Sequence, residues 1–247
     1  MNADETGWRV DGQNHWLWVF TNKDAALYQI DKSRGSKVVD NILGKEYHGV
    51  LISDFYSAYN KLQALACKRC LGHLLAEIKK VQEKNKLAPE SIDGMFCQEL
   101  KTVLKQTIDV WNEYHKGTKV FEDLVKEKER AIARIVELLS LPIKHKDTQR
   151  VRKRIIKFNQ ELFTFLDNPH ASPTNNRAKA AIETICHYEK DNFRQPFRFG
   201  GFKPGSDDEY YSDRHLEWYR TIKYFTGFIS KAFNFIYGIA KDKVAMN

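Results

Sequence analysis

Two hydrophobic periods divide the chain, and the first is typical of β-strands. Between residues 7 and 60, apolar and polar positions alternate at the two-residue spacing of half-buried strands. Turn-forming residues, Asp11-Gly12-Gln13-Asn14, separate two such runs and predict a β-hairpin. A third strand is predicted over residues 25–30. The alternating apolar positions are Trp8, Val10, Trp16, Trp18 and Phe20.

A helix and a buried strand follow these three strands. Ser36 is a suitable N-cap for a short helix, and Gly44 ends that helix. The apolar run Val50-Leu51-Ile52, which leads to Ser53-Asp54, is typical of a strand buried on both faces. Three consecutive strands, a helix and a buried strand together predict a mixed sheet of the α/β class.

From about residue 72 the apolar positions follow a helical period. Pro142 ends the third of four helical stripes, because proline cannot continue a helix. The stripes predict helices within residues 74–81, 100–111, 124–139 and 151–165.

These periods predict three segments. Residues 1–91 form the first part of the α/β core, residues 92–169 are a helical insertion, and residues 170–247 contain a further core helix and a C-terminal helix. The core helix begins near Pro173-Thr174-Asn175-Asn176, with Thr174 or Asn175 as its cap. The aromatic-rich stretch 217–240 is also predicted to be helical.

The composition narrows the class of function. The 247 residues include 40 Lys+Arg and 32 Asp+Glu, which give a formal net charge of +8, and 42% are hydrophobic. This balance excludes disordered and fibrous proteins and favours an anionic partner, with nucleic acid first. Four cysteines are too few for a disulfide scaffold. No apolar stretch reaches the roughly 20 residues of a bilayer span, so a cytoplasmic protein without a membrane partner is expected.

Two carboxylates stand at informative positions. Asp54 follows the predicted buried strand, and α/β proteins place their sites at the carboxyl ends of strands. Asp4 opens the first strand and can approach the end of a neighbouring strand. Two converging carboxylates suit the hard divalent cations Mg²⁺ and Mn²⁺. The alternative is that Asp4 is a terminal charge and that Asp54 caps a helix beginning at Phe55, and spacing alone favours it.

Four sequence blocks, in order over residues 4–183, resemble the IS66 family of transposases. Each block is short, but their order is specific, and residues 217–221 resemble the last helix of the family more loosely. The blocks are Asp4-Glu5-Thr6-Gly7-Trp8, Ser53-Asp54-Phe55-Tyr56-Ser57-Ala58-Tyr59-Asn60, Cys70-Leu71-Gly72-His73-Leu74-Leu75 and Thr174-Asn175-Asn176-Arg177-Ala178.

The resemblance implies a ribonuclease-H-like fold, here with an inserted helical region, and a DDE-type catalytic site. Asp4 and Asp54 correspond to the first two acids of that site and would bind Mg²⁺ or Mn²⁺. The implied chemistry is two-metal phosphoryl transfer on DNA, with transposon ends and target as partners. Assembly as a homo-oligomer is left open.

The third acid is missing from its expected position. In the family it is a Glu that follows Asn-Asn-x-Ala, whereas here Lys179 follows Ala178. An ammonium cannot ligate a cation, and a like charge about 4 Å away costs about 4 kcal/mol at an effective dielectric near 20. Glu183 lies one turn further on the same helix face, about 6 Å along the axis. We therefore expect an impaired transposase unless Glu183 compensates.

Two other classes of function remain open. One is a catalytically inactive, DNA-binding remnant of a transposase, and the other is a helical interaction protein unrelated to DNA. Only three residues precede Asp4, whereas family members carry an N-terminal region with DNA-binding parts. The chain is therefore expected to be a fragment or a remnant.

Basic residues concentrate where the helix over 151–165 begins. They predict sequence-independent phosphate contacts with DNA, and a solvated helix face is the equally weighted alternative. The predicted DNA-binding residues are Arg150, Arg152, Lys153, Arg154, Lys157 and Arg177.

Cys67, Cys70 and His73 have a spacing that can supply three zinc ligands. No second Cys-x-x-Cys pair follows, so we favour small buried thiols at the end of a strand, with His73 on the next helix. In that position His73 can lie near the acidic site.

Overall fold

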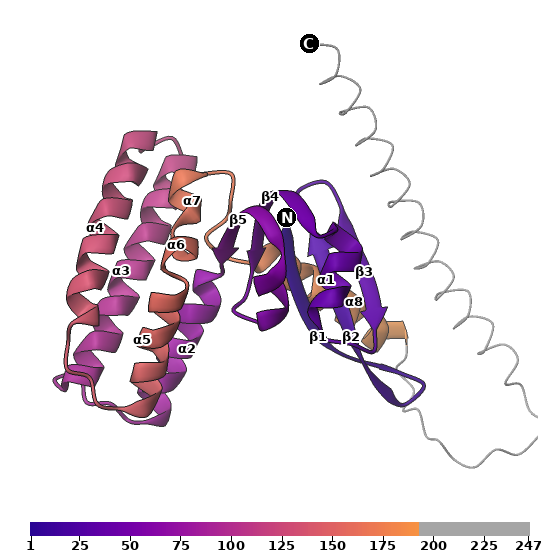
Figure 1. Ribbon diagram of the computed structural model, residues 1–247, viewed down its shortest axis with the longest axis horizontal. Coiled ribbons are helices and arrows are strands. Elements are labelled where there is room, and N and C mark those ends of the chain that lie inside the picture. Colours follow the sequence, from indigo (N-terminus) through magenta and orange to yellow (C-terminus); the bar gives the residue numbers. More distant parts are fainter. Residues whose placement is uncertain (193–247) are drawn as a thin grey trace, which may run out of the picture. The chain divides into compact units, whose positions relative to one another are not determined.

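The computed structural model describes residues 1–192 (Figure 1), so the helix predicted over 217–240 lies outside the described residues. No helix within the described part is long and apolar enough to cross a membrane. Its strands are β1 (Asn2–Val10), β2 (Gln13–Thr21), β3 (Ala26–Asp31), β4 (Glu46–Ser53) and β5 (Gln63–Arg69). Its helices are α1 (Ser36–Leu43), the 3-10 helix η1 (Ser57–Lys61), α2 (Leu71–Lys84), α3 (Ile92–His115), α4 (Phe121–Leu139), α5 (Lys146–Lys157), α6 (Asn159–Leu162), α7 (Thr164–Asp167) and α8 (Asn176–Asn192).

The strands form one mixed sheet in the order β3-β2-β1-β4-β5. β1 runs parallel to β4 and β4 parallel to β5, whereas β2 and β3 are antiparallel. Together with the helices, this mixed sheet confirms the predicted α/β class. The ribonuclease-H-like topology stays a prediction.

The described residues divide into two compact units. The first contains residues 1–4 and 33–179, and the second contains residues 5–32 together with the chain from residue 180 onward. β1 and α8 therefore each contribute to both units. Asp4 and Asp54 both belong to the first unit.

The second unit contains the hairpin that the sequence predicts. Its two-residue turn consists of Asp11 and Gly12, whose φ angles are 49° and 73°. Two consecutive positive φ angles are typical of a type I′ turn, which matches the right-handed twist of the strands that it joins. The core of this unit joins β1 and β2 to α8 through Trp8, Leu17, Val19, Ile182 and Ile185.

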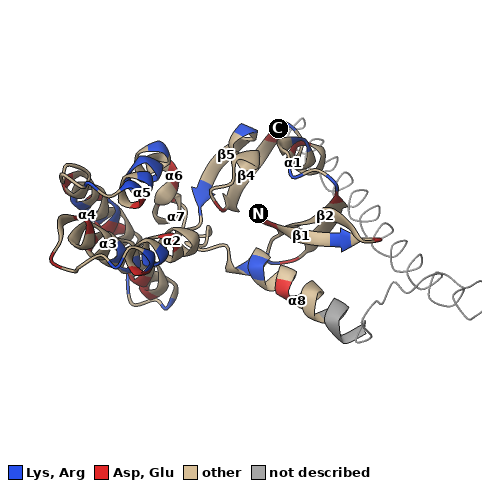
Figure 2. Ribbon diagram, turned by 90° about the horizontal axis from the view of Figure 1, so that it is seen from below, with Lys and Arg blue, Asp and Glu red and all other residues tan. Residues whose placement is uncertain are grey.

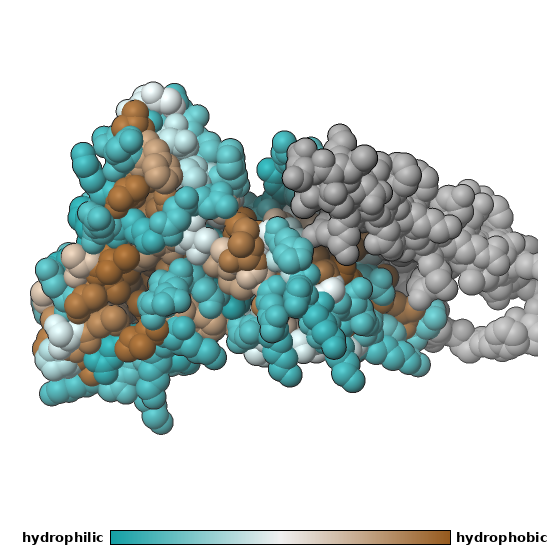
Figure 3. Space-filling model, turned by 45° about the horizontal axis from the view of Figure 1, so that its top comes forward, coloured by the Kyte–Doolittle hydropathy of each residue, from teal (hydrophilic) through white to brown (hydrophobic). Residues whose placement is uncertain are grey.

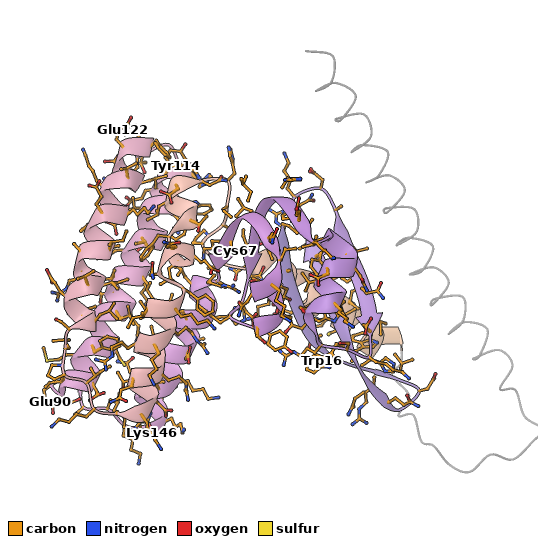
Figure 4. All side chains as sticks on the ribbon, viewed as in Figure 1. Trp16, Cys67, Glu90, Tyr114, Glu122 and Lys146 are labelled. Carbon is orange, nitrogen blue, oxygen red and sulfur yellow. The ribbon has the colours of Figure 1, made fainter. Side chains whose placement is uncertain are left out.

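The first unit contains a bundle of long helices. Glu90 and Lys146 lie at one end of this bundle, and Tyr114 and Glu122 lie at the other (Figure 4), so α3 and α4 are antiparallel. Apolar side chains from each helix meet between them, as the helical period predicts. The core includes Leu74, Ile78, Val81, Phe96, Leu100, Val103, Leu104, Leu124, Ala131, Ile135, Leu138, Val151, Ile155 and Phe165.

The sequence indicated a strand that ends beside Cys67 and Cys70, and β5 ends there, although its start was not predicted. Two other expectations from the sequence were wrong in detail. The N-cap of α1 is Gly35 and not Ser36, which is the first helical residue. The helix expected over 151–165 is three helices, because Phe158 (φ −112°, ψ 22°) and Phe163 (φ −113°, ψ 15°) leave helical geometry. Both phenylalanines are buried, so the chain bends where their rings enter the core.

The tight packing of Gly94 gives the first prediction. A Cβ at this position would lie 2.0 Å from the carbonyl oxygen of Ala88. We expect Gly94→Ala to lower the free energy of unfolding by about 1–3 kcal/mol, measured by urea unfolding followed by circular dichroism. Gly7→Ala is the matched control, since a Cβ there meets no atom within 4 Å. Equal stability of the two variants would contradict the crowding at Gly94.

Candidate active site

Asp4 lies on β1, and Asp54 directly follows the neighbouring strand β4. Asn2 of β1 pairs in parallel register with Ile52 of β4, and the Ile52 N–H donates to the Met1 carbonyl at 2.8 Å. Parallel strands advance together, so Asp4, two residues after Asn2, is level with Asp54, two residues after Ile52. Asp4 is thus the third residue of β1 and not its start.

Asp54 also forms the turn that follows β4. Its Oδ1 accepts the N–H of Tyr56 at 2.8 Å, as in an Asx turn. The helical turn beyond it is η1, which begins at Ser57 and not at Phe55. The carboxylate of Asp54 therefore orders the local backbone with one of its two oxygens.

Arg69, at the end of β5, holds the backbone of Asp54. Its side chain is only 2% exposed and donates to the Asp54 carbonyl at 2.9 Å and to the Ser53 hydroxyl at 3.2 Å. Its other nitrogens donate to Asn60 at 2.8 Å and to the Glu161 carboxylate at 2.6 Å. Because the buried guanidinium needs all these acceptors, it fixes the ends of β4 and β5 relative to η1 and α6.

A hydrogen-bonded pair, Cys70 and His73, begins α2. Cys70 is the N-cap residue, and its sulfur accepts the N–H of Asn175 at 3.1 Å. Burial alone would raise the pKa of Cys70. The hydrogen bond from His73 and the positive charges of His73 and Lys68 outweigh burial, so the pKa of Cys70 is lowered.

The negative charges of both aspartates affect the pKa of His73. Its hydrogen bond to Cys70 is the largest cause that raises the pKa of His73 to about 9. Partial burial opposes this shift, and the negative charges of Cys70, Asp4 and Asp54 add to it. Such effects weaken with distance, and both aspartates are close enough to raise the pKa of His73. At neutral pH the imidazole is therefore protonated.

The start of α8 is bonded to the same region. Asn175 stands directly before α8, and its side chain donates to the carbonyl of Ala3 at 2.7 Å instead of capping the helix. Its Oδ1 is buried without a hydrogen-bond partner among the described residues. The fully buried Lys68 donates to the carbonyl of Pro173, and burial lowers the pKa of Lys68 to about 7.

Lys179 and Glu183, the two residues considered for the third-acid position, fall in different units. Lys179 is exposed on the first turn of α8, within the unit that contains Asp4 and Asp54. Glu183 is exposed one turn later and belongs to the other unit. Whether Glu183 replaces the third acid therefore stays a prediction.

The described residues near Asp4 and Asp54 include few oxygen donors for a hard divalent cation. Asp4 and Asp54 supply two carboxylates, and the unpartnered Oδ1 of Asn175 adds a neutral oxygen in the same region. Within the part of the chain that the structure describes, no group of three His, Cys, Asp or Glu residues is arranged to hold a metal ion. Lys179, on the first turn of α8, adds no acid to this set.

Two of the predicted DNA-binding residues on α5 are engaged within the protein. Arg150 and Arg154 both pair with Glu77 of α2, at 3.4 and 2.5 Å. Arg150 also pairs with Asp147 at 3.0 Å. These ion pairs attach α5 to α2, and they reduce the positive charge that these arginines offer to a phosphate.

Figure 2 marks the basic residues along α5 and at the start of α8 in blue. Lys153 and Lys157 are exposed on α5, and Arg177 is exposed on the first turn of α8. Arg152 is half-buried and donates to the carbonyl of Leu141 at 3.2 Å. Among the predicted DNA-binding residues of α5, the two lysines are therefore the best placed for sequence-independent contact with a polyanion.

Three residues that hold this region were missed in the sequence. Lys68 and Arg69 are two basic residues at the end of an apolar stretch, directly before a helix, and that position is the signal that could have found them. Glu161 has no local signal, because it is 92 residues away from Arg69, with which it pairs.

A comparison with known families places the chain among transposases. A family model described as "Transposase IS66 family" matches residues 1–192, a range that includes Asp4, Asp54, His73 and Lys179. No curated protein and no solved structure gives a significant match. The family match extends over most of the 247 residues, and we conclude that the chain belongs to the IS66 family of transposases.

Proposed function

We propose that this chain is the catalytic domain of a DDE-type DNA transposase that acts in the cytoplasm on transposon ends and target DNA. Membership of the IS66 family supports a transposase-type function. The observation that carries the finer proposal is the register of β1 and β4, which places Asp4 level with Asp54. The shared influence of both carboxylates on His73 supports it.

Asp4 and Asp54 are the residues that would hold Mg²⁺ or Mn²⁺. Such an ion stabilises the charge that develops during phosphoryl transfer. Arg69 and the Tyr56 N–H keep Asp54 in place, and the protonated His73 offsets the repulsion between the two carboxylates. This chain's own groups thus pre-organise an acidic pair before any substrate arrives.

Lys179 impairs strand cleavage and transfer in this proposal. Its ammonium lies on the first turn of α8, in the same unit as the two aspartates, and repels a nearby cation. This observation also favours a second candidate function, a catalytically inactive, DNA-binding remnant of a transposase. We expect a catalytically inactive remnant not to bind a divalent cation, so a measurement of Mn²⁺ binding distinguishes the two candidate functions.

The acidic pair predicts a measurable affinity for Mn²⁺. We expect Asp4→Asn and Asp54→Asn each to weaken Mn²⁺ binding at least about tenfold in a calorimetric titration, because each removes a full negative charge but keeps the side-chain shape. Asp109→Asn, at an exposed position on α3, is the matched control and should change the affinity less than about twofold. A wild-type chain that binds no Mn²⁺ would favour the inactive remnant.

Lys179 predicts a gain on substitution. We expect Lys179→Glu to tighten Mn²⁺ binding at least about tenfold, and to increase Mn²⁺-dependent cleavage of a plasmid that carries the transposon ends, because an acid replaces a like charge. Glu183→Gln should change neither quantity more than about twofold. Robust cleavage by the wild type that Glu183→Gln abolishes would identify Glu183 as the third acid and contradict the impairment.

The basic face of α5 predicts salt-dependent DNA binding. We expect the double variant Lys153→Gln/Lys157→Gln to reduce the slope of log affinity against log salt by about 2, because each lysine releases about one counterion from DNA. Fluorescence anisotropy with a random duplex measures that slope. The control is Lys105→Gln/Lys119→Gln, which changes two exposed lysines elsewhere. Equal slopes for the two variants would show that α5 is only a solvated face.

A further inference from the structure

One face of α4 exposes apolar side chains that do not belong to the core. Phe121, Val125, Ile132 and Val136, here called the α4 stripe, are between 41% and 61% exposed. Their spacings of four, seven and four residues keep them within about 60° of the helix circumference. Figure 3 shows hydrophobic residues, in brown, exposed among hydrophilic residues, in teal, on the surface of the molecule. The core side of α4 is formed by other residues: Leu124, Ala131, Ile135 and Leu138.

The α4 stripe is symmetric about its own midpoint. That midpoint falls between Lys128 and Glu129, with Val125 and Ile132 at equal distances on either side of it. Phe121 and Val136 are also equidistant from it, further out. Because the apolar positions are symmetric about this midpoint, an antiparallel second copy would place apolar residues opposite apolar residues. A two-fold symmetric interface brings the same surface of both copies together in this way.

We propose that two copies of this chain associate through the α4 stripe, with their α4 helices antiparallel about a two-fold axis. In this arrangement Val125 packs against the partner's Ile132, and Phe121 packs against the partner's Val136. Both contacts occur twice, so eight apolar side chains leave water together.

The charges nearest the midpoint allow this pairing. Lys128, on one side of the stripe, pairs with Asp167 at 2.6 Å. Lys126 and Glu129 are exposed on its other side. In an antiparallel two-fold pair, each flank of the stripe faces the same flank of the partner, so a flank with a net charge near the axis would face an equal charge and be repelled. Near the axis, one flank carries Lys128 and Asp167 and the other carries Lys126 and Glu129, so each has one positive and one negative group.

The size of the stripe sets the expected strength. Its four side chains cover less than the roughly 800 Å² per partner of a standard stable interface. We therefore expect a dimer that forms at micromolar concentrations and not a permanent one. Association through the α4 stripe requires neither metal nor DNA, so it can be tested independently of the proposed function.

Sedimentation velocity of the full chain tests the association. Between about 1 and about 100 µM the wild type should shift from monomer to dimer, and Val125→Glu should weaken that association at least tenfold. Ile156→Glu is the matched control, because Ile156 is an exposed apolar residue of another helix, α5. It should leave the association unchanged. A wild-type chain that stays monomeric throughout, or equal effects of the two variants, would overturn the proposal.

Cysteine cross-linking tests the antiparallel geometry without relying on the Glu variant. Under mild oxidation with copper–phenanthroline, a mixture of Val125→Cys and Ile132→Cys chains should form far more covalent dimer than either variant alone. The wild-type chain, which has free cysteines of its own, gives the background. Efficient cross-linking of Val125→Cys with itself would show parallel packing and contradict the proposal. A cross-link from that cysteine to another part of its own chain would contradict it too, because the stripe would then be covered in cis.

Discussion

The parallel pairing of β1 with β4 is the constraint on which the acidic site depends. Asp4 and Asp54 are 50 positions apart in the sequence, and nothing local connects them. The register of Asn2 with Ile52 places them at one level. Because side chains alternate between the two faces of a strand, a slip of one residue would turn one carboxylate to the opposite face. A few backbone hydrogen bonds thus decide whether two acids can act on one cation.

Buried charges carry much of the support for this pairing. Lys68 and Arg69 are almost fully buried at the end of β5, where desolvation of a charge is costly unless its donors are satisfied. For Arg69, hydrogen bonds to the Glu161 carboxylate and to the Asp54 carbonyl offset this cost. For Lys68, a hydrogen bond to the Arg69 carbonyl and a lowered pKa reduce it. These bonds specify one arrangement of strands and loops, because any other would leave a buried charge without acceptors.

The position of the site and its chemistry have separate determinants in this chain. The bonds from Asn175 and Lys68 hold the start of α8 against β1 and β5. In the proposed site, the residue at the third-acid position is Lys179, whose charge is opposite to that of an acid. In that proposal a single side chain changes the electrostatics of the site, and the hydrogen bonds that hold the start of α8 do not involve that side chain.

The sequence by itself determined the local elements and the family. Alternating and helical periods located β2, β3 and the long helices, because these patterns depend on which side of a single element is buried. Ordered sequence blocks identified the IS66 resemblance, and the family match confirmed it. The two aspartates were singled out as well, but spacing alone favoured separate, ordinary roles for them.

Only the tertiary structure decided what these elements do together. β5 ends in Lys68 and Arg69, which look like surface residues until their distant acceptors are known. The breaks at Phe158 and Phe163 have no glycine or proline to announce them, because burial of the two rings outweighs helix propensity. The register of β1 with β4 likewise depends on partners far away in the chain. Short-range patterns follow from each segment's own residues, whereas burial, register and ion pairs are settled only when distant segments compete for the same partners.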